Sequence, residues 1–177
     1  KEIEGYCQYT LPTHGIITNC GKAHLEGFGG LDGVRKGKGE LYDYLRSQGG
    51  TAFAMWDFDY LRTMSSGIKK LITYGTADAD YIGEVIKSEP FLEINIRNGA
   101  NTGHIQSQLV GDYNLPNLLV AVAVGKHFGV DDTNIKQSIE NYSPSNSRSQ
   151  LMQIGTNTII LDAYNANPSS MKRAIEN

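Results

Sequence analysis

The sequence has 177 residues, of which 40% are hydrophobic and 20% charged, the composition of a soluble globular protein. A net charge of -3 without any run of five lysines and arginines excludes the usual nucleic-acid-binding proteins. No apolar run reaches the roughly 18 residues of a membrane-spanning helix. Two cysteines, Cys7 and Cys20, are too few for a disulfide framework. We therefore expect a reduced, cytoplasmic protein with both thiols as small core residues, and neither a nucleic-acid nor a membrane partner.

The first half of the chain alternates short apolar runs with amphipathic segments. Leu31, Val34, Leu41 and Leu45 recur at helical spacing, and Gly49-Gly50 follows as a stop signal. The patterns predict strands at 15–19, 51–56 and 71–74, and helices at 31–48 and 59–66. Such alternation is typical of βαβ units and of a mostly parallel sheet flanked by helices, the α/β fold class.

The second half begins with a change of pattern. Short alternating runs at 81–82, 91–96 and 106–110 surround the hairpin signal Asn98-Gly99, which predicts a small antiparallel insertion. Helices are predicted at 114–128, where Asn117, Val120, Ala121 and Val124 share one side, and at 131–142.

A Pro/Ser stretch at 144–147 is the best linker candidate. Strands are predicted beyond it at 150–154 and 158–162, before a helix opened by Pro168. About thirty residues cannot complete a domain (roughly 50 residues or more are usual), so we expect the sequence to be part of a longer chain.

The glycine-rich segment at 21–30 directly follows a predicted strand and contains His24. Ligands of parallel sheets bind beyond the carboxyl ends of strands, so His24 is a candidate ligand-binding residue. Alternatively, His24 hydrogen-bonds locally and the glycines only form the turn. The phosphate-binding pattern GxxxxGK[ST] does not occur in the sequence.

Lys38 belongs to a basic stretch, with Arg35 and Lys36, on the predicted helix at 31–48. In one interpretation this stretch is a solvated face. In the other, Lys38 points into the crevice at the sheet edge, where a desolvated lysine could be modified as the neutral amine. The spacing is compatible with both.

Asn114 and Asn117 stand three residues apart where a helix begins, and Pro116 suits its first turn. Their amides could cap the helix or bind a polar ring such as a nucleobase. The pattern alone does not choose between these roles.

Taken in order, these motifs resemble the Mur ligases. The order is AHLEGFGG, then KGE with Lys38 fourteen residues after His24, then GxxNxxN before an Ala/Val-rich helix, then Arg148 and DAYNANPSSM. The resemblance extends over essentially the whole chain. YNANP and NxGxAHLEGFG, beginning at Asn19, are most similar to the member that adds D-alanyl-D-alanine to UDP-N-acetylmuramoyl-tripeptide.

The resemblance implies a domain organisation and a reaction. Residues 1–146 would be the P-loop-NTPase-like central ATP-binding domain without its P-loop part, and residues 147–177 the beginning of a Rossmann-like C-terminal domain. ATP would phosphorylate the tripeptide carboxylate, and the dipeptide amine would attack the acyl phosphate, in peptidoglycan precursor synthesis. We expect the full-length enzyme to be a monomer with two Mg²⁺ sites, and the present chain alone to be inactive.

The resemblance also assigns residues to the site. His24 would bind the second Mg²⁺, and Lys38, carbamylated by CO₂, would hold the same ion through its new oxygens; hard Mg²⁺ prefers such ligands. Asn114 and Asn117 would lie near the adenine. The nucleotide contacts of the C-terminal domain would be Arg148 at the phosphates and Asp162, and His24, Lys38 and Arg148 would be the catalytic group.

Three positions depart from the family pattern: Tyr113 stands where histidine is common, Met55 where asparagine is frequent, and Leu161 where an aspartate pair begins, whereas Asp57 is retained. Tyr164, Asn165 and Asn167 receive no definite role. Two alternatives stay open: another ligase of the superfamily, adding a different amino acid or extending folate with glutamate, and a non-catalytic module that keeps the fold.

Overall fold

The computed structural model describes residues 2–21, 29–144, 150–161, 171–172 and 175. The chain divides into two compact units, Lys1–Asp80 and Tyr81–Asn177, which we describe one at a time. The linker predicted at 144–147 and the helix predicted at Pro168 fall largely or wholly outside the described residues.

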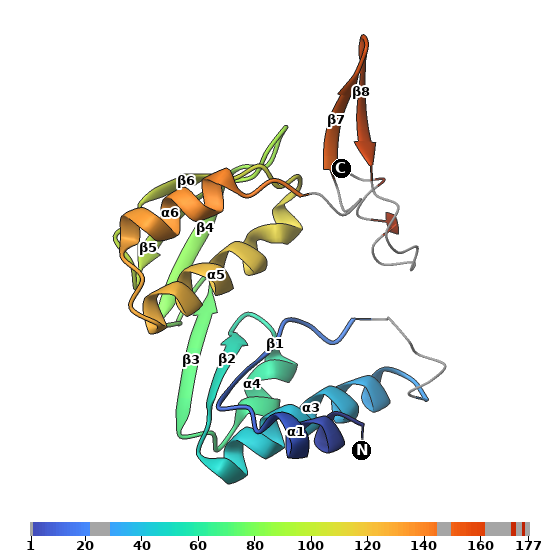
Figure 1. Cartoon of the computed structure of the whole chain (residues 1–177), viewed down its shortest axis with the longest axis vertical. Coiled ribbons are helices and arrows are strands. Elements are labelled where there is room, and N and C mark those ends of the chain that lie inside the picture. Colours follow the sequence, from blue (N-terminus) through green and yellow to red (C-terminus); the bar gives the residue numbers. More distant parts are fainter. Residues whose placement is uncertain (1, 22–28, 145–149, 162–170, 173–174, 176–177) are drawn as a thin grey trace. The chain divides into compact units, whose positions relative to one another are not determined.

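The first unit contains a parallel sheet with the strand order β1-β2-β3. Its strands are β1 (His14–Ile17), β2 (Thr51–Met55) and β3 (Lys70–Gly75), and its helices are α1 (Glu2–Thr10), α3 (Leu31–Gln48) and α4 (Asp59–Ser65) (Figure 1). Helix α3 packs on β1 and β2, and α4 packs on β2. The predicted alternation of parallel strands and helices is confirmed.

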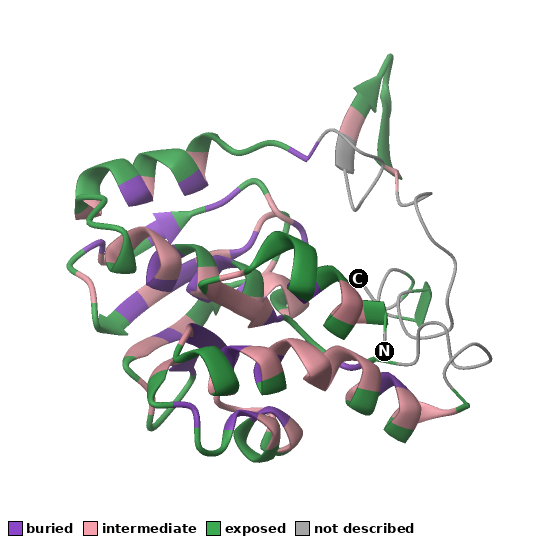
Figure 2. Ribbon diagram, turned by 60° about the horizontal axis from the view of Figure 1, so that its bottom comes forward, coloured by how far each residue is buried: buried purple, intermediate pink, exposed green. Residues whose placement is uncertain are grey.

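The core of this unit forms where β2 and α3 meet. All five residues of β2 are buried, as expected for a central parallel strand with both faces covered. Helix α3 ends at Gly49 in the left-handed conformation (φ 69°), where the predicted stop lies. Gly15 allows α3 to approach β1 closely, because a Cβ atom there would lie 2.8 Å from Leu45 Cδ1. Figure 2 shows the buried residues gathered on strands and on one side of the helices.

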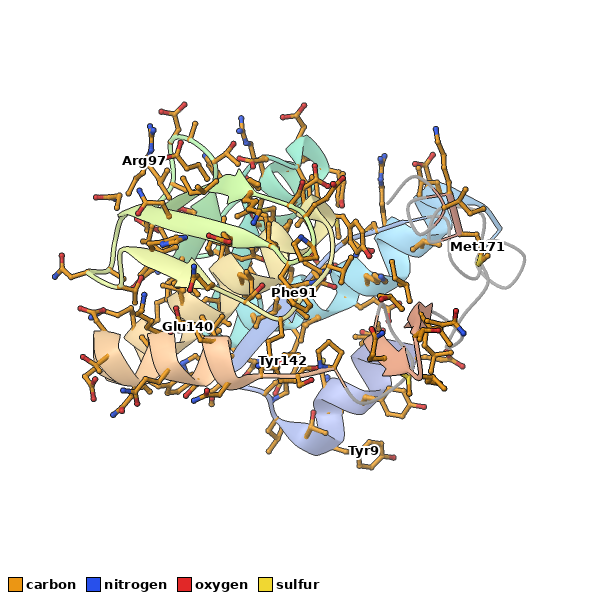
Figure 3. All side chains as sticks on the ribbon, turned by 90° about the horizontal axis from the view of Figure 1, so that it is seen from above. Tyr9, Phe91, Arg97, Glu140, Tyr142 and Met171 are labelled. Atoms are coloured by element: carbon orange, nitrogen blue, oxygen red, sulfur yellow. The ribbon has the colours of Figure 1, made fainter. Side chains whose placement is uncertain are left out.

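Helix α1 has no counterpart among the predicted elements. Cys7 is its one buried residue, whereas Tyr6 and Tyr9 are 67% and 88% exposed, and Figure 3 shows Tyr9 pointing away from the helix. Helix α1 packs on α3, and the Glu4 backbone N–H donates to Glu40 Oε2 at 3.0 Å. A single apolar anchor produces no clear hydrophobic period, which explains why the sequence pattern missed this helix.

The second unit contains an antiparallel sheet in the order β4-β5-β6 and a separate antiparallel pair, β7-β8. Its strands are β4 (Tyr81–Lys87), β5 (Glu93–Asn98), β6 (His104–Gln106), β7 (Gln150–Ile154) and β8 (Asn157–Leu161). Its helices are the 3₁₀ turn η1 (Asp112–Asn114), α5 (Leu115–His127) and α6 (Asp132–Asn141). The predicted antiparallel insertion, both helices and both late strands are confirmed.

The third strand of the insertion lies earlier than predicted. The alternating run suggested 106–110, but β6 covers His104–Gln106. Beyond β6 the backbone still pairs with Leu92: the Ser107 N–H donates to the Leu92 carbonyl at 3.1 Å, and the Leu92 N–H donates to the Leu109 carbonyl at 2.7 Å. The Ser107 hydroxyl also donates to the Leu92 carbonyl at 2.7 Å and accepts from the Leu109 N–H at 3.3 Å. The regular strand therefore ends at Gln106, where one serine side chain adds local hydrogen bonds to an irregular continuation of the pairing.

Helix α5 buries Leu115, Leu118, Leu119, Val122 and Ala123. The side predicted from Asn117, Val120, Ala121 and Val124 is the opposite one, and it is exposed or half-buried. Asp131 is the N-cap of helix α6, and its carboxylate accepts from the Asn134 N–H at 2.9 Å. Among the described residues, no helix is long and apolar enough to cross a bilayer.

Candidate functional site

The first group of candidate residues lies at the carboxyl end of β1. Lys38 is half-buried on α3, and its Nζ donates to the Asn19 carbonyl at 2.6 Å. Asn19 follows the last residue of β1, Ile17, by two positions. The neighbouring Lys36 is exposed. Of the two interpretations of Lys38, the structure favours the one in which the side chain reaches the strand end.

The peptide unit between Asn19 and Cys20 is held at both of its polar atoms. Lys38 donates to its carbonyl oxygen, and its N–H donates to the Tyr60 hydroxyl at 3.2 Å. Lys38 belongs to α3 and Tyr60 to α4, so two helices meet at one peptide plane directly after β1. This arrangement fixes the point at which the chain enters the glycine-rich segment.

Arg35 and Phe58 flank Tyr60 in a small aromatic and cationic cluster. The Arg35 guanidinium carbon lies 5.0 Å from the centre of the Tyr60 ring, and Phe58 stacks on that ring at 5.4 Å. Arg35 Nε is buried without a hydrogen-bond partner in the described part of the chain. Burial raises the pKa of the Cys20 thiol, and the charges of Lys38 and Arg35 act against that rise. Both cations therefore lie close to Cys20.

Asp57 connects the carboxyl ends of the next two strands. Its two carboxylate oxygens accept from the Thr76 N–H at 3.0 and 3.1 Å. Gly75 allows this approach, because a Cβ atom there would stand 2.6 Å from Asp57 Oδ1. The carboxylate thus has a structural role between β2 and β3.

The second group lies in the second unit, at the start of α5. Asn114 Nδ2 donates to the Val110 carbonyl at 2.9 Å, and Asn117 Nδ2 donates to Asn114 Oδ1 at 2.9 Å. Neither asparagine caps α5 through its side chain, although Pro116 occupies the first turn as predicted. The Asn114 side chain is therefore fixed by hydrogen bonds at both its nitrogen and its oxygen. Asn117 is exposed, and among the described residues its amide oxygen accepts no hydrogen bond, so it can accept one from a ligand.

Gly111 shapes the turn before these asparagines. Its φ of 88° is in the left-handed region, and a Cβ atom there would lie 2.3 Å from the ring of Tyr113. The Asn114 N–H donates to the Gly111 carbonyl at 3.2 Å. The tight turn therefore positions Asn114 through bonds to the carbonyls of Gly111 and Val110.

Several predicted site residues cannot be placed. His24, Arg148, Asp162 and the segment with Tyr164, Asn165 and Asn167 lie outside the described residues. In the described ranges, no three His, Cys, Asp or Glu side chains come together as metal ligands.

Sequence analysis missed the contributions of Asn19 and Tyr60. Asn19 acts through its backbone carbonyl, and no sequence pattern marks Tyr60 as its neighbour, because the contact joins residues far apart in the chain. The position of Arg35 could have been predicted from the sequence, because it precedes Lys38 by three residues and therefore lies on the same helix face.

Residues 2–125 match the family model described as the Mur ligase middle domain. The chain belongs to the Mur ligase family. The match includes the Lys38 group and both asparagines. The domain boundary at 146/147 and the roles of individual residues stay predictions.

Individual Mur ligases match nearly the whole chain. The UDP-N-acetylmuramoyl-tripeptide–D-alanyl-D-alanine ligase of Bacillus subtilis is 28% identical over 176 residues, covering 99% of this chain and 38% of the relative. A crystal structure of MurF from Acinetobacter baumannii, 26% identical, superposes with a TM-score of 0.81 over 98% of this chain and 39% of that one. MurF from Thermotoga maritima in complex with ADP, 22% identical, has a TM-score of 0.78 over 99% and 41%, and supports the fold alone. The chain thus spans about two-fifths of the length of these Mur ligases.

Proposed function

We propose that the chain is part of an ATP-dependent ligase that joins D-alanyl-D-alanine to UDP-N-acetylmuramoyl-tripeptide. The observation that carries the proposal is the similarity, over 99% of the chain, to a relative named for that reaction. The motifs YNANP and NxGxAHLEGFG support the same member of the family. The reaction belongs to cell-wall precursor synthesis, and we propose the cytoplasm as its compartment.

The proposed reaction has two steps. A carboxylate oxygen of the tripeptide attacks the γ-phosphorus of ATP, and ADP leaves. The dipeptide amine then attacks the carbonyl carbon of the acyl phosphate, inorganic phosphate leaves with the bonding electrons, and the amine releases its proton. Such reactions depend mainly on positioning and on charge stabilisation.

Nucleotide binding is proposed for Asn114 and Asn117 and, by family resemblance, for Arg148 and Asp162. The exposed Asn117 amide offers a donor and an acceptor, the two functions that an adenine edge requires. Asn114 orients that amide through a bond of 2.9 Å.

The hydrogen bond of Lys38 to the Asn19 carbonyl is compatible with the proposed carbamate on Lys38. A carbamylated lysine keeps one N–H, which can still donate to the Asn19 carbonyl that Lys38 Nζ contacts at 2.6 Å. The new carboxylate would then supply the oxygen ligands that Mg²⁺ prefers, together with His24. When bound, Mg²⁺ would neutralise the charge that develops on the phosphates. The role of Lys38 itself is to present that carboxylate from a fixed point at the end of β1.

The experiment uses the complete protein that contains this chain. With ATP, Mg²⁺, UDP-N-acetylmuramoyl-tripeptide and D-alanyl-D-alanine, we expect phosphate release and a ligated product detected by mass spectrometry. Omission of the dipeptide should abolish the ligated product. A protein that is folded and binds ATP but forms no product with these substrates would contradict the proposal.

The alternative is a Mur ligase for another acceptor. The same assay with L-alanine, D-glutamate or a diamino acid, each with its matching precursor, or with a folate and glutamate, distinguishes the two. A product with one of these and none with D-alanyl-D-alanine would assign the chain to that other reaction. No ATP turnover with any of them would favour the non-catalytic module.

A further inference from the structure

We propose that Tyr60 is a positioning residue for Lys38, and that it acts through the peptide unit between Asn19 and Cys20. The inference rests on the proposed function, because it takes the orientation of Lys38 to matter for the metal site. It adds a residue that neither the family match nor the motifs single out.

The first step concerns the peptide plane. A peptide unit is planar, so an interaction that fixes the direction of its N–H also fixes the direction of its C=O. The Cys20 N–H donates to the Tyr60 hydroxyl at 3.2 Å, and the Asn19 carbonyl of the same unit accepts from Lys38 Nζ at 2.6 Å. The Tyr60 hydroxyl therefore determines where the acceptor of Lys38 points.

The second step concerns the support of Tyr60 itself. Phe58 stacks on its ring at 5.4 Å, and the Arg35 guanidinium lies over the ring at 5.0 Å. Arg35 and Lys38 are three positions apart on α3 and lie on the same helix face. This face therefore contacts both the Tyr60 ring, through Arg35, and the Asn19 carbonyl, through Lys38. The Tyr60 hydroxyl is neutral near pH 7, as tyrosines ordinarily are, and burial raises its pKa further. A neutral hydroxyl held by two neighbours is suited to a fixed acceptor role.

The third step separates positioning from simple packing. Tyr60 is half-buried, whereas the tyrosines that fill the core of this unit are Tyr42 and Tyr74. A packing role would depend on the ring of Tyr60 and not on its oxygen. Removal of the hydroxyl should then leave metal binding unchanged, whereas a positioning role predicts weaker metal binding with the fold intact.

The test compares Tyr60→Phe with the wild-type complete protein, saturated with a non-hydrolysable ATP analogue and titrated with Mg²⁺ in a calorimeter in bicarbonate buffer. We expect Mg²⁺ to bind about 10-fold more weakly to the variant, the scale on which loss of a ligand's supporting partner weakens a metal site. Tyr9→Phe removes a hydroxyl from an 88% exposed side chain and should bind as wild type. Tyr60→Trp, whose indole N–H can only donate, should resemble Tyr60→Phe.

A double-mutant cycle shows whether the effect passes through Lys38. In a Lys38→Met background, Tyr60→Phe should cause no further loss of Mg²⁺ affinity, since coupled residues are not additive. Unchanged Mg²⁺ affinity in Tyr60→Phe, or an equal loss in both backgrounds, overturns the proposal. If Lys38→Met itself binds Mg²⁺ as wild type does, the proposal falls together with the metal role of Lys38. Ligase turnover of the wild type, measured separately, decides the proposed reaction.

Discussion

Lys38 and Tyr60 hold one peptide unit from opposite sides, Lys38 at the Asn19 carbonyl (2.6 Å) and Tyr60 at the Cys20 N–H (3.2 Å). The two residues are on different helices, so this peptide unit joins α3 and α4 at the end of β1. The chain continues from there into the segment that contains His24. Lys38, the main candidate for catalysis, is therefore hydrogen-bonded to the backbone just before the glycine-rich segment begins.

Replacement of Lys38 by methionine should reduce ligase turnover with little change in thermal stability. Loss of one charge-stabilising group typically lowers kcat on the order of 100- to 1,000-fold. Lys36→Met is the matched control, because Lys36 is exposed on the same helix, two residues away. Phosphate release under saturating substrates is the measurement, and equal turnover of the two variants would remove Lys38 from the site.

Replacement of Asn117 by alanine should raise the KM for ATP by roughly 3- to 10-fold, the effect of one lost hydrogen bond. Because the amide is proposed to contact the adenine in both ground and transition states, kcat should stay nearly constant. Initial rates at varied ATP concentration provide the measurement. Asn141→Ala, an exposed residue at the end of α6, is the control. An unchanged KM in Asn117→Ala would mean that this amide does not bind the nucleotide.

Gly111→Ala should lower the free energy of unfolding by roughly 2 to 5 kcal/mol, from backbone strain at a positive φ together with overpacking. The φ is 88°, and the new methyl group would lie 2.3 Å from the Tyr113 ring. Gly129→Ala isolates the strain, because its φ of 76° is similar but, among the described residues other than its chain neighbours, no atom lies within 4 Å of the new Cβ. That control should lose only about 1–2 kcal/mol.

Urea denaturation of the three proteins measures these differences. Addition of Tyr113→Ala to Gly111→Ala should recover part of the loss by removing the ring. Equal losses for Gly111→Ala and Gly129→Ala would contradict the close contact between Gly111 and Tyr113.

Alkaline unfolding should depend on Tyr42. Burial raises the pKa of its hydroxyl from 10.0 to about 12, and the hydroxyl donates to the Phe53 carbonyl at 2.5 Å. Since the folded pKa is the higher one, the folded state keeps this proton after the unfolded state has lost it. The resulting stability is complete below pH 10 and is lost as the pH rises to about 12. The loss amounts to about 3 kcal/mol for two pKa units.

Tyr42→Phe should show a smaller decrease between pH 10 and 12 in urea denaturation. The variant should also be less stable at neutral pH by about 1–3 kcal/mol, because the Phe53 carbonyl loses its buried donor. Burial also raises the pKa of Tyr74, so part of the alkaline decrease should persist. The same decrease in both proteins would exclude Tyr42 as its source.

Local patterns in the sequence were sufficient for most of the regular elements, helix α1 and the bounds of β6 being the exceptions. The helical spacing of Leu31 to Leu45 and the stop at Gly49 predicted α3 with its observed bounds, and the Asn98-Gly99 signal predicted the antiparallel insertion. These features depend on contacts between neighbours in the chain and on one buried face. Both appear in the sequence as a regular spacing of apolar and turn-forming residues. The family motifs, read in order, were likewise sufficient to recognise a Mur ligase.

Tertiary structure decided what those patterns left open. Whether Lys38 faced solvent or the sheet edge depended on a carbonyl nineteen residues away, and the Tyr60 contact joins residues forty positions apart. Helix α1 packs on α3 with Cys7 as its one buried residue, and β6 ends at Gln106, where the Ser107 hydroxyl adds bonds to Leu92 and Leu109. The sequence by itself determined most of the elements and the family, because both are encoded by local spacing. The partner of each polar group was decided only by folding, because hydrogen bonds depend on direction and distance between segments that the sequence does not place together.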